Sequence, residues 1–128
     1  MIIAVDSSVL IDLQQGKKAP YLAMLEDALA ADDVMLPPVV LAEILSNPRE
    51  DQSKNYEYLR NINLLETDEG YWQRAGLLRK KILQKKLKAK LGDALIAQSC
   101  IDHAVPLLTR DEDFKHYAKY CGLKLVQY

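Results

Sequence analysis

The sequence predicts an α/β fold: a three-layer α/β/α sandwich with a mainly parallel central sheet. Short apolar runs rich in β-branched residues, such as residues 2–5, are typical of strands that are buried on both faces. Segments with apolar residues at helical spacing separate these runs, and strands that alternate with helices in this way favour parallel pairing. No internal repeat or low-complexity linker interrupts the pattern, so we expect residues 1–128 to form one domain.

The predicted elements follow one another along the whole chain. We expect strands at residues 2–5, 34–36, 63–66, 105–108 and 123–126. We expect helices at residues 9–13, 21–29, 39–46, 49–62, 72–87, 94–103 and 114–120. Ser7 and Ser8 are residue types that cap helices, so the first strand should turn directly into the first helix. Pro38 suits the start of the third helix, because the N–H that proline lacks would have no partner there.

The composition is that of a soluble globular protein and excludes several classes. A net charge of −1 gives no overall attraction to nucleic acid, although it leaves a local basic patch open. The two cysteines are too few for a disulfide framework or a zinc site, and we expect Cys100 to be a small buried thiol. No apolar run approaches the roughly 20 residues of a membrane-spanning helix. The N-terminus also lacks the features of a secretory signal, so we expect a cytoplasmic protein without membrane contact.

Three acidic residues occur at the end of a strand or where the pattern favours apolar side chains. Asp6 directly follows the strand at residues 2–5, and Glu43 shares the apolar stripe of the third helix or lies at its edge. Asp93 precedes apolar residues at helical spacing in the same manner. An ionised carboxylate near the edge of a core is costly unless a cation or a metal ion pairs with it. For Asp93 the alternative is an ordinary acid in the first turn of a helix, stabilised by the helix dipole.

A fourth acidic position lies in the turn after the strand at residues 105–108. This turn contains Asp111 and Asp113, and it follows its strand as Asp6 follows the first one. The alternative interpretation is a polar turn in which Asp111 or Asp113, preferably Asp113, caps the helix that begins at Phe114. Ligands bind at the carboxyl ends of parallel strands, so these positions favour a shared site at one edge of the sheet.

Clustered carboxylates indicate a particular chemistry. Mg²⁺ and Mn²⁺ prefer carboxylate and water ligands and keep positions open for phosphate oxygens. Such ions stabilise the charge of an in-line phosphoryl displacement and activate water. The sequence offers no serine–histidine or cysteine–histidine nucleophile set, and we expect His103 and His116 to be solvated. Metal-assisted hydrolysis of a phosphodiester is therefore the best-matched reaction.

Four motifs, in this order, resemble the PIN-domain ribonucleases, and in particular the VapC-type toxins of bacterial and archaeal toxin–antitoxin pairs. They are residues 3–13, 39–45, 93–97 and 107–114. The resemblance covers essentially the whole chain and implies a PIN-like nuclease domain over residues 1–128. It also implies an endoribonuclease that depends on Mg²⁺ or Mn²⁺, a homodimer, and neutralisation by a cognate antitoxin protein.

The resemblance also implies roles for individual residues. The metal-binding and catalytic acids would be Asp6, Glu43, Asp93 and Asp111. Asp113 is the alternative to Asp111 as the fourth acid, and Ser7 or Thr109 would position a water molecule or a phosphate. Residues 46–56 depart from the family pattern, which affects the expected substrate and partner contacts more than the chemistry.

A basic segment leads to Asp93. Residues 79–90 carry seven lysines and arginines and no acid. A surface that binds phosphates beside an acidic site would hold a strand that the carboxylates repel, whereas the alternative is a solvated helix face. The candidates for RNA contact are Lys85, Lys86, Lys88, Lys90 and Arg110.

Other functional classes fit less well. A receiver domain needs an acidic pair after its first strand, whereas Asp6 stands alone, and a haloacid dehalogenase needs a second aspartate where this chain has Ser8. The remaining alternatives are a PIN-domain nuclease of RNA processing that is not a toxin, and a non-catalytic PIN module that binds RNA or protein. We expect Asp12 to be an acid on the surface of the first helix.

Overall fold

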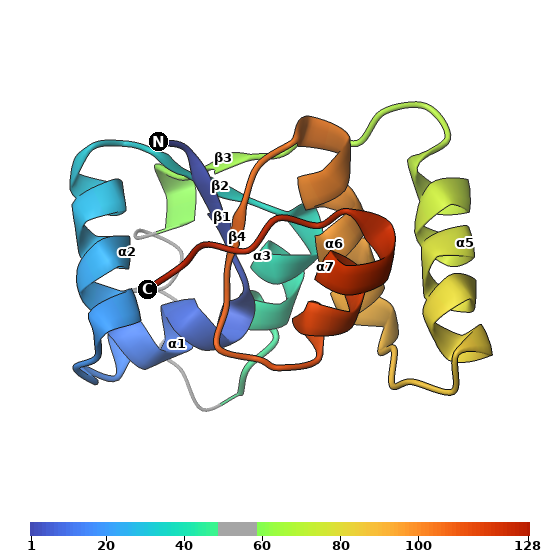
Figure 1. The fold of residues 1–128 in the computed structure, drawn as a ribbon. Helices are drawn as coiled ribbons and strands as arrows, with labels where there is room; N and C mark the ends of the chain where they lie inside the picture. The colour runs from blue at the N-terminus through green and yellow to red at the C-terminus, as the bar shows by residue number, and fades with distance from the viewer. Residues whose placement is uncertain (49–58) are drawn as a thin grey trace.

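The computed structural model describes residues 1–48 and 59–128, and it confirms the predicted fold class (Figure 1). The strands are β1 (Ile3–Val5), β2 (Val34–Leu36), β3 (Asn63–Leu64) and β4 (Leu107–Leu108). The helices are α1 (Ser7–Gln14), α2 (Pro20–Ala30), α3 (Pro38–Leu45), α5 (Tyr71–Gln84), α6 (Leu91–His103) and α7 (Phe114–Cys121). The prediction of a helix at residues 49–62 falls mostly outside the described residues.

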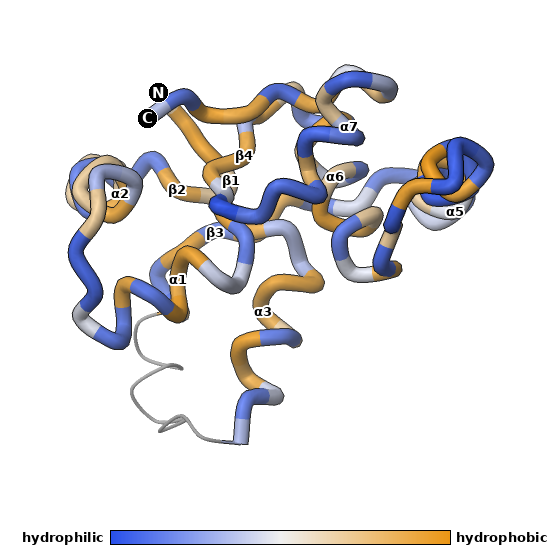
Figure 2. The backbone as a smooth tube through the Cα atoms, turned by 60° about the horizontal axis from the view of Figure 1, so that its bottom comes forward, coloured by the Kyte–Doolittle hydropathy of each residue, from blue (hydrophilic) through white to orange (hydrophobic). Residues whose placement is uncertain are grey.

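The four strands form one parallel sheet in the order β3-β2-β1-β4. Ala4 pairs with Met35 on one side and with Leu107 on the other, so β1 lies in the middle. Every residue of β1 is buried, as the apolar run predicts for a strand covered on both faces, but Ile2, which the prediction included, precedes the strand and is exposed. Figure 2 shows β1 as a hydrophobic segment, and α3 as hydrophobic along most of its length.

Several elements are shorter than predicted, and the strand expected at residues 105–108 is the two-residue β4, Leu107–Leu108. The expected strand at residues 123–126 is a single parallel bridge between Leu107 and Leu125, because the two residues of β4 offer few backbone groups for pairing. The expected strand at residues 63–66 is the two-residue β3. The helix predicted to reach residue 87 ends at Gln84, because the chain turns at Lys86, whose φ of +61° is left-handed.

The strand order places a switch point between β1 and β4. From β1 the chain moves outward to β2 and β3, and it then returns to the opposite side of β1 to form β4. In open parallel sheets, ligands bind beyond the carboxyl ends of the strands at the point where the order reverses. Figure 1 shows the carboxyl ends of β1 and β4 and the loop before α6 at the same edge, at the bottom of the view.

No helix within the described ranges combines the length and apolar character needed to cross a bilayer. Cys100 is buried in α6, which confirms the prediction of a small buried thiol.

Candidate active site

Asp6 occupies the carboxyl end of β1 and caps α1. The residue is only 4% exposed. Its Oδ1 accepts hydrogen bonds from the Val9 amide at 3.1 Å and from the Ser8 hydroxyl at 2.8 Å. Asp6 is therefore the helix cap that we expected Ser7 or Ser8 to provide, and Ser8 supports it. Its carboxylate is fixed in position by the start of the helix.

The turn after β4 is tied to Asp6. The Thr109 hydroxyl donates a hydrogen bond to Asp6 Oδ2, and its oxygen accepts one from the Asp111 amide at 3.0 Å. Asp111 Oδ1 in turn accepts a hydrogen bond from the Asp113 amide at 2.9 Å. Asp113 is the N-cap residue of α7, as one interpretation of the sequence predicts, but its side chain makes no capping hydrogen bond to the helix. The turn thereby holds two carboxylates beside the switch point.

Asp93, Asp111 and Asp113 form the acidic cluster of this edge. Each offers a carboxylate oxygen, and these oxygens lie within 4.8 Å of one another. Asp93 stands in the first turn of α6, whereas the other two come from the turn after β4. The structure thus brings both candidates for the fourth acid to Asp93.

Glu43 reaches this edge from α3. The residue is exposed rather than part of the apolar stripe, because α3 buries Val40 and Ile44 instead. Its carboxylate nevertheless faces the site, since a Cβ atom at Gly92 in α6 would lie 3.3 Å from Glu43 Oε2. Although the residue as a whole is exposed, desolvation of its carboxylate raises the pKa of Glu43, and the charge of Asp6 raises it further, while a hydrogen bond from Ser7 opposes the rise.

The acids repel one another. Burial raises the pKa of Asp93 to about 6, and the charges of Asp111, Asp113 and Glu43 add to the effect. Burial also raises the pKa of Asp6, against the hydrogen bonds from Thr109, Ser8 and Val9, and the charge of Asp111 raises it further. Repulsion of this kind disappears when a cation occupies the site. The donor atoms are carboxylate oxygens, which suit Mg²⁺ or Mn²⁺ better than a metal that prefers thiolate or imidazole ligands.

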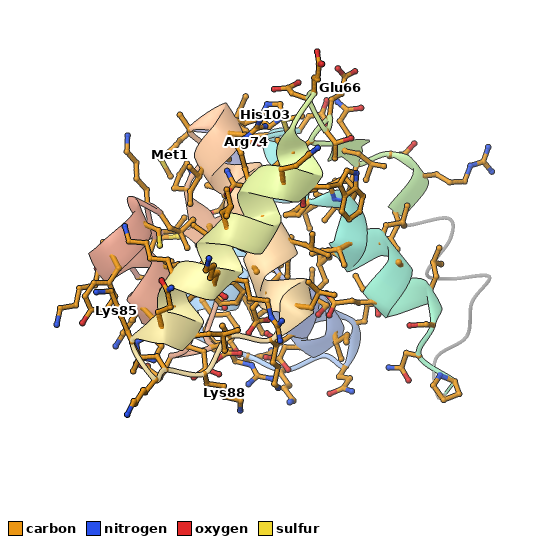
Figure 3. The ribbon with its side chains drawn as sticks, turned by 90° about the vertical axis from the view of Figure 1, so that its right-hand side faces the viewer. Met1, Glu66, Arg74, Lys85, Lys88 and His103 are labelled. Carbon is orange, nitrogen blue, oxygen red and sulfur yellow. The ribbon has the colours of Figure 1, made fainter. Side chains whose placement is uncertain are left out.

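The basic segment begins in helix α5, which ends at Gln84, and the part of it that borders this cluster is a loop. Lys85 to Lys90 connect α5 to α6. Lys88 Nζ lies 3.8 Å from Asp113 Oδ2, and the charge of Lys90 lowers the pKa of both Glu43 and Asp93. The Lys85 ammonium instead lies over the Tyr120 ring, 4.3 Å from its centroid. In Figure 3, Lys85 and Lys88 lie at the opposite end of the molecule from Glu66 and His103.

Asp12 and Arg110 differ from the sequence prediction in their burial and contacts. Asp12 is 1% exposed and not a surface acid, because α1 packs it under the turn after β4. There it pairs with Arg110, whose Nε lies 2.6 Å from Asp12 Oδ2, so the guanidinium proposed to contact RNA is held by a carboxylate. His103 lies at the end of α6 opposite Asp93, within 2.6 Å of the Glu66 carbonyl, and so takes no part in the cluster.

Gly92 is a functional residue that the sequence prediction missed. It lies next to Asp93 in the first turn of α6, where glycine is less favourable than alanine, and a glycine at such a position indicates a special role. The structural reason is the approach of the Glu43 carboxylate, which a side chain at residue 92 would crowd.

If the site hydrolyses phosphodiesters, as the sequence predicts, Gly92→Ala is expected to lower the rate of that reaction without weakening the fold. The added Cβ forces the Glu43 carboxylate to move by a few tenths of an ångström, and small displacements in an active site cost about tenfold or more in rate. Alanine also favours a helix over glycine by about 0.5–1 kcal/mol, so the variant should unfold at no lower temperature. Turnover and thermal unfolding of the purified variant test both expectations.

Gly76→Ala is the matched control. Gly76 lies in α5, and a Cβ there meets no atom within 4 Å, so this variant gains the same helix preference without touching the site. Turnover should stay at the level of the unmodified protein. An equal loss of turnover in the two variants would contradict the role of Gly92.

Comparison with known proteins relates the chain to one protein family and its fold to that of solved toxin–antitoxin structures. The family model for the PIN domain matches residues 3–120. A search of curated proteins gave no match. Among solved structures, VapBC2 from Rickettsia felis bound to a promoter DNA fragment matches with a TM-score of 0.76 and 21% identity, over 100% of this chain and 99% of that one.

Two further solved structures are similar. VapBC-1 from nontypeable Haemophilus influenzae matches with a TM-score of 0.74 and 15% identity, over 99% of this chain and 98% of that one. A toxin–antitoxin complex from Klebsiella pneumoniae matches with a TM-score of 0.69 and 22% identity, over 94% of each chain. At these identities the structural matches show a shared fold.

Proposed function

Because the chain belongs to the PIN domain family, we propose that it is an endoribonuclease that hydrolyses RNA with Mg²⁺ or Mn²⁺. One observation carries this proposal: the cluster of Asp93, Asp111 and Asp113, with oxygens within 4.8 Å of one another, beside Asp6 at the switch point of the sheet. A fixed set of carboxylates at this position fits a metal-assisted reaction on a phosphodiester.

The protein groups would divide the work as follows. Asp6, Glu43, Asp93 and Asp111 would hold the metal, with Asp113 as the alternative to Asp111. The bound ion would activate the attacking water and stabilise negative charge on the phosphate. Thr109 orients the Asp6 carboxylate through its hydroxyl, and Ser7 does the same for Glu43. In the overall reaction the water oxygen bonds to phosphorus and the bond from phosphorus to the leaving oxygen breaks. One proton of the water passes to solvent, and the leaving oxygen takes up a proton from solvent.

Lys86, Lys88 and Lys90 would hold the RNA backbone next to the acids. The Lys88 side chain is 62% exposed, so its ion pair with Asp113 is weak and its ammonium is free to turn toward a phosphate. Counter-charges at this point are needed because the carboxylates repel the strand that they must act on. This loop would therefore supply affinity and the acids would supply chemistry.

The direct test measures cleavage of structured and unstructured RNA by the purified protein. We expect cleavage with Mg²⁺ or Mn²⁺, none with EDTA, and recovery when the metal is restored. A DNA oligonucleotide of the same sequence tests the choice of substrate and should be cut more slowly. Cleavage that persists in EDTA would contradict the metal-dependent mechanism.

Lys86→Gln combined with Lys88→Gln is expected to weaken RNA binding by about tenfold at moderate salt, with unchanged Mn²⁺ affinity. Each phosphate contact that is lost also lowers the slope of log K against log salt by about 0.7 for a single strand. Binding to a fluorescent RNA across a salt series measures both quantities. Lys18→Gln combined with Lys124→Gln removes the same charge away from the loop and serves as the control, so equal weakening by the two pairs would contradict a specific role of the loop.

We further propose that the protein is the toxin of a type II toxin–antitoxin pair, is a homodimer, and is neutralised by an antitoxin protein. Its fold is that of the toxin–antitoxin structures above, and large hydrophobic side chains are exposed on and beside α5, among them Trp72, Leu77 and Leu91. Exposed apolar surface of this kind favours protein contacts. Light scattering tests the dimer, and co-expression with the neighbouring gene product tests the antitoxin.

A further inference from the structure

Asp12 is a buried carboxylate that lies outside the acidic cluster. Three segments of the chain supply its partners. The Lys17 ammonium lies 3.0 Å from Oδ1, the Tyr21 hydroxyl donates a hydrogen bond to Oδ2 at 2.7 Å, and the Arg110 Nε–H donates to Oδ2 at 2.6 Å. A carboxylate that is 1% exposed requires such partners, because an unpaired buried charge is costly. The site therefore has a built charge pair that the metal chemistry does not use.

The Arg110 end of this pair lies within the catalytic turn. Its neighbours in the chain are Thr109, which bonds Asp6, and Asp111, which belongs to the acidic cluster. A second guanidinium nitrogen, Nη2, lies 3.4 Å from Asp12 Oδ1, so the contact has two points. The turn is thus fastened to α1 at two successive residues, to the helix cap through Thr109 and to the sixth helical residue through Arg110.

The C-terminal stretch adds a second anchor to the same arrangement. The Tyr128 hydroxyl donates a hydrogen bond to the Thr109 carbonyl at 3.2 Å. The Tyr128 ring lies against the ring of Tyr21, with the centroids 5.5 Å apart, and Tyr21 is the residue that bonds Asp12. The contacts of Asp12 are therefore continuous with those that hold the backbone of the turn.

We propose that Asp12 and Arg110 are positioning residues that hold the turn at residues 109–113 in the shape needed to place Asp111 and Asp113 beside Asp93. Arg110 then acts on the turn rather than on RNA, because two of its guanidinium nitrogens, Nε and Nη2, already contact a buried carboxylate. A two-point contact depends on the planar fork of arginine, which lysine lacks. The catalytic meaning of this pair rests on the proposed nuclease function, although the ordering of the turn does not.

The first measurement is amide hydrogen exchange in Asp12→Asn, Arg110→Ala and the double variant. The amides of Asp111 and Asp113 donate the two hydrogen bonds that define the turn, so they should exchange at least about tenfold faster in each variant. The double variant should be no worse than either single variant, because the two residues act as one unit. Unchanged exchange at these two amides would overturn the proposal, whether or not the protein cleaves RNA.

The second measurement separates positioning from phosphate contact. If the pair positions the turn, Asp12→Asn, Arg110→Ala and Arg110→Lys should each weaken Mn²⁺ binding severalfold and lower kcat about tenfold, with little change in KM for RNA. If Arg110 contacts phosphate, Arg110→Ala raises KM, Arg110→Lys keeps most of the function, and Asp12→Asn has no effect. That second pattern would overturn the proposal, as would effects of Asp12 and Arg110 that simply add.

The control is an ion pair of the same type at the far end of α6. Arg74 contacts Asp102 through Nε at 3.2 Å and Nη2 at 2.7 Å, and the carboxylate is 12% exposed. Arg74→Ala and Asp102→Asn should destabilise the protein to a similar degree and leave the exchange of Asp111 and Asp113, the Mn²⁺ affinity and kcat unchanged. Equal losses in this pair would mean that general destabilisation explains the result, and would overturn the positioning role.

Discussion

Asp6→Asn is expected to abolish RNA cleavage while the protein stays folded. Asparagine keeps an oxygen that can accept the hydrogen bonds of the Val9 amide and the Ser8 hydroxyl, so the cap of α1 survives. The substitution removes the negative charge at the carboxyl end of β1, where a metal ion would be held. Loss of metal-derived stabilisation of several kcal/mol corresponds to a fall in kcat of at least about 10³-fold. The measurement is initial-rate cleavage of RNA in Mg²⁺, beside circular dichroism of both proteins.

Asp33→Asn provides the comparison for this result. Asp33 precedes β2, so it lies at the amino-terminal edge of the parallel sheet, and its carboxylate pairs with the N-terminal ammonium at 3.2 Å. The Asp33→Asn substitution removes the same charge far from the switch point and should leave RNA cleavage unchanged. Retention of more than about a tenth of the activity in Asp6→Asn would mean that Asp6 is a structural cap and not a metal ligand.

Asp93→Asn is expected to make the metal-free protein more stable and to remove its response to metal. The pKa of Asp93 is raised from 3.8 to about 6, so the folded protein binds this proton more tightly than the unfolded chain does. Stability from this residue is therefore fully present below pH 3.8, and it is lost as the pH rises toward about 6. Because Asp93 is partly exposed, we expect a gain of about 1–2 kcal/mol in the free energy of unfolding above about pH 7.

Thermal unfolding with and without Mn²⁺ distinguishes the two effects of this substitution. In EDTA at neutral pH, Asp93→Asn should melt several degrees higher than the unmodified protein, and the difference should vanish near pH 4. Mn²⁺ at about 100 times its Kd should stabilise the unmodified protein by about 2.7 kcal/mol and the variant by much less. A variant that is less stable in EDTA would contradict the strained cluster, since it would show that the Asp93 charge is favourable in the fold.

The parts of the site that were predictable are those that local pattern determines. The continuous apolar run of β1 followed by Asp6, and the helical spacing after Asp93, place each acid on its element from neighbouring residues alone. The carboxyl ends of parallel strands share an edge, so the approximate convergence of Asp6 with the turn near Asp111 also followed from the pattern.

The parts that were not predictable depend on contacts between residues far apart in the chain. Asp12 looks like a polar position in a short helix, and its burial is explained only by Arg110, which lies 98 residues away. The exposed Glu43 reaches the site because Gly92 leaves room for its carboxylate. The strand order that creates the switch point is likewise a tertiary property, which β-branched composition does not determine.

The central claim is that these acids bind catalytic metal at the switch point. It is tested most directly by adding Mn²⁺ to isotope-labelled protein and recording which backbone amides are broadened. The proposed site predicts selective broadening around Asp6, Asp93 and Asp111, at low Mn²⁺ concentration, and its loss in Asp93→Asn. Broadening centred on the exposed acids Glu26 and Asp27 of α2, or an unchanged pattern in Asp93→Asn, would contradict it.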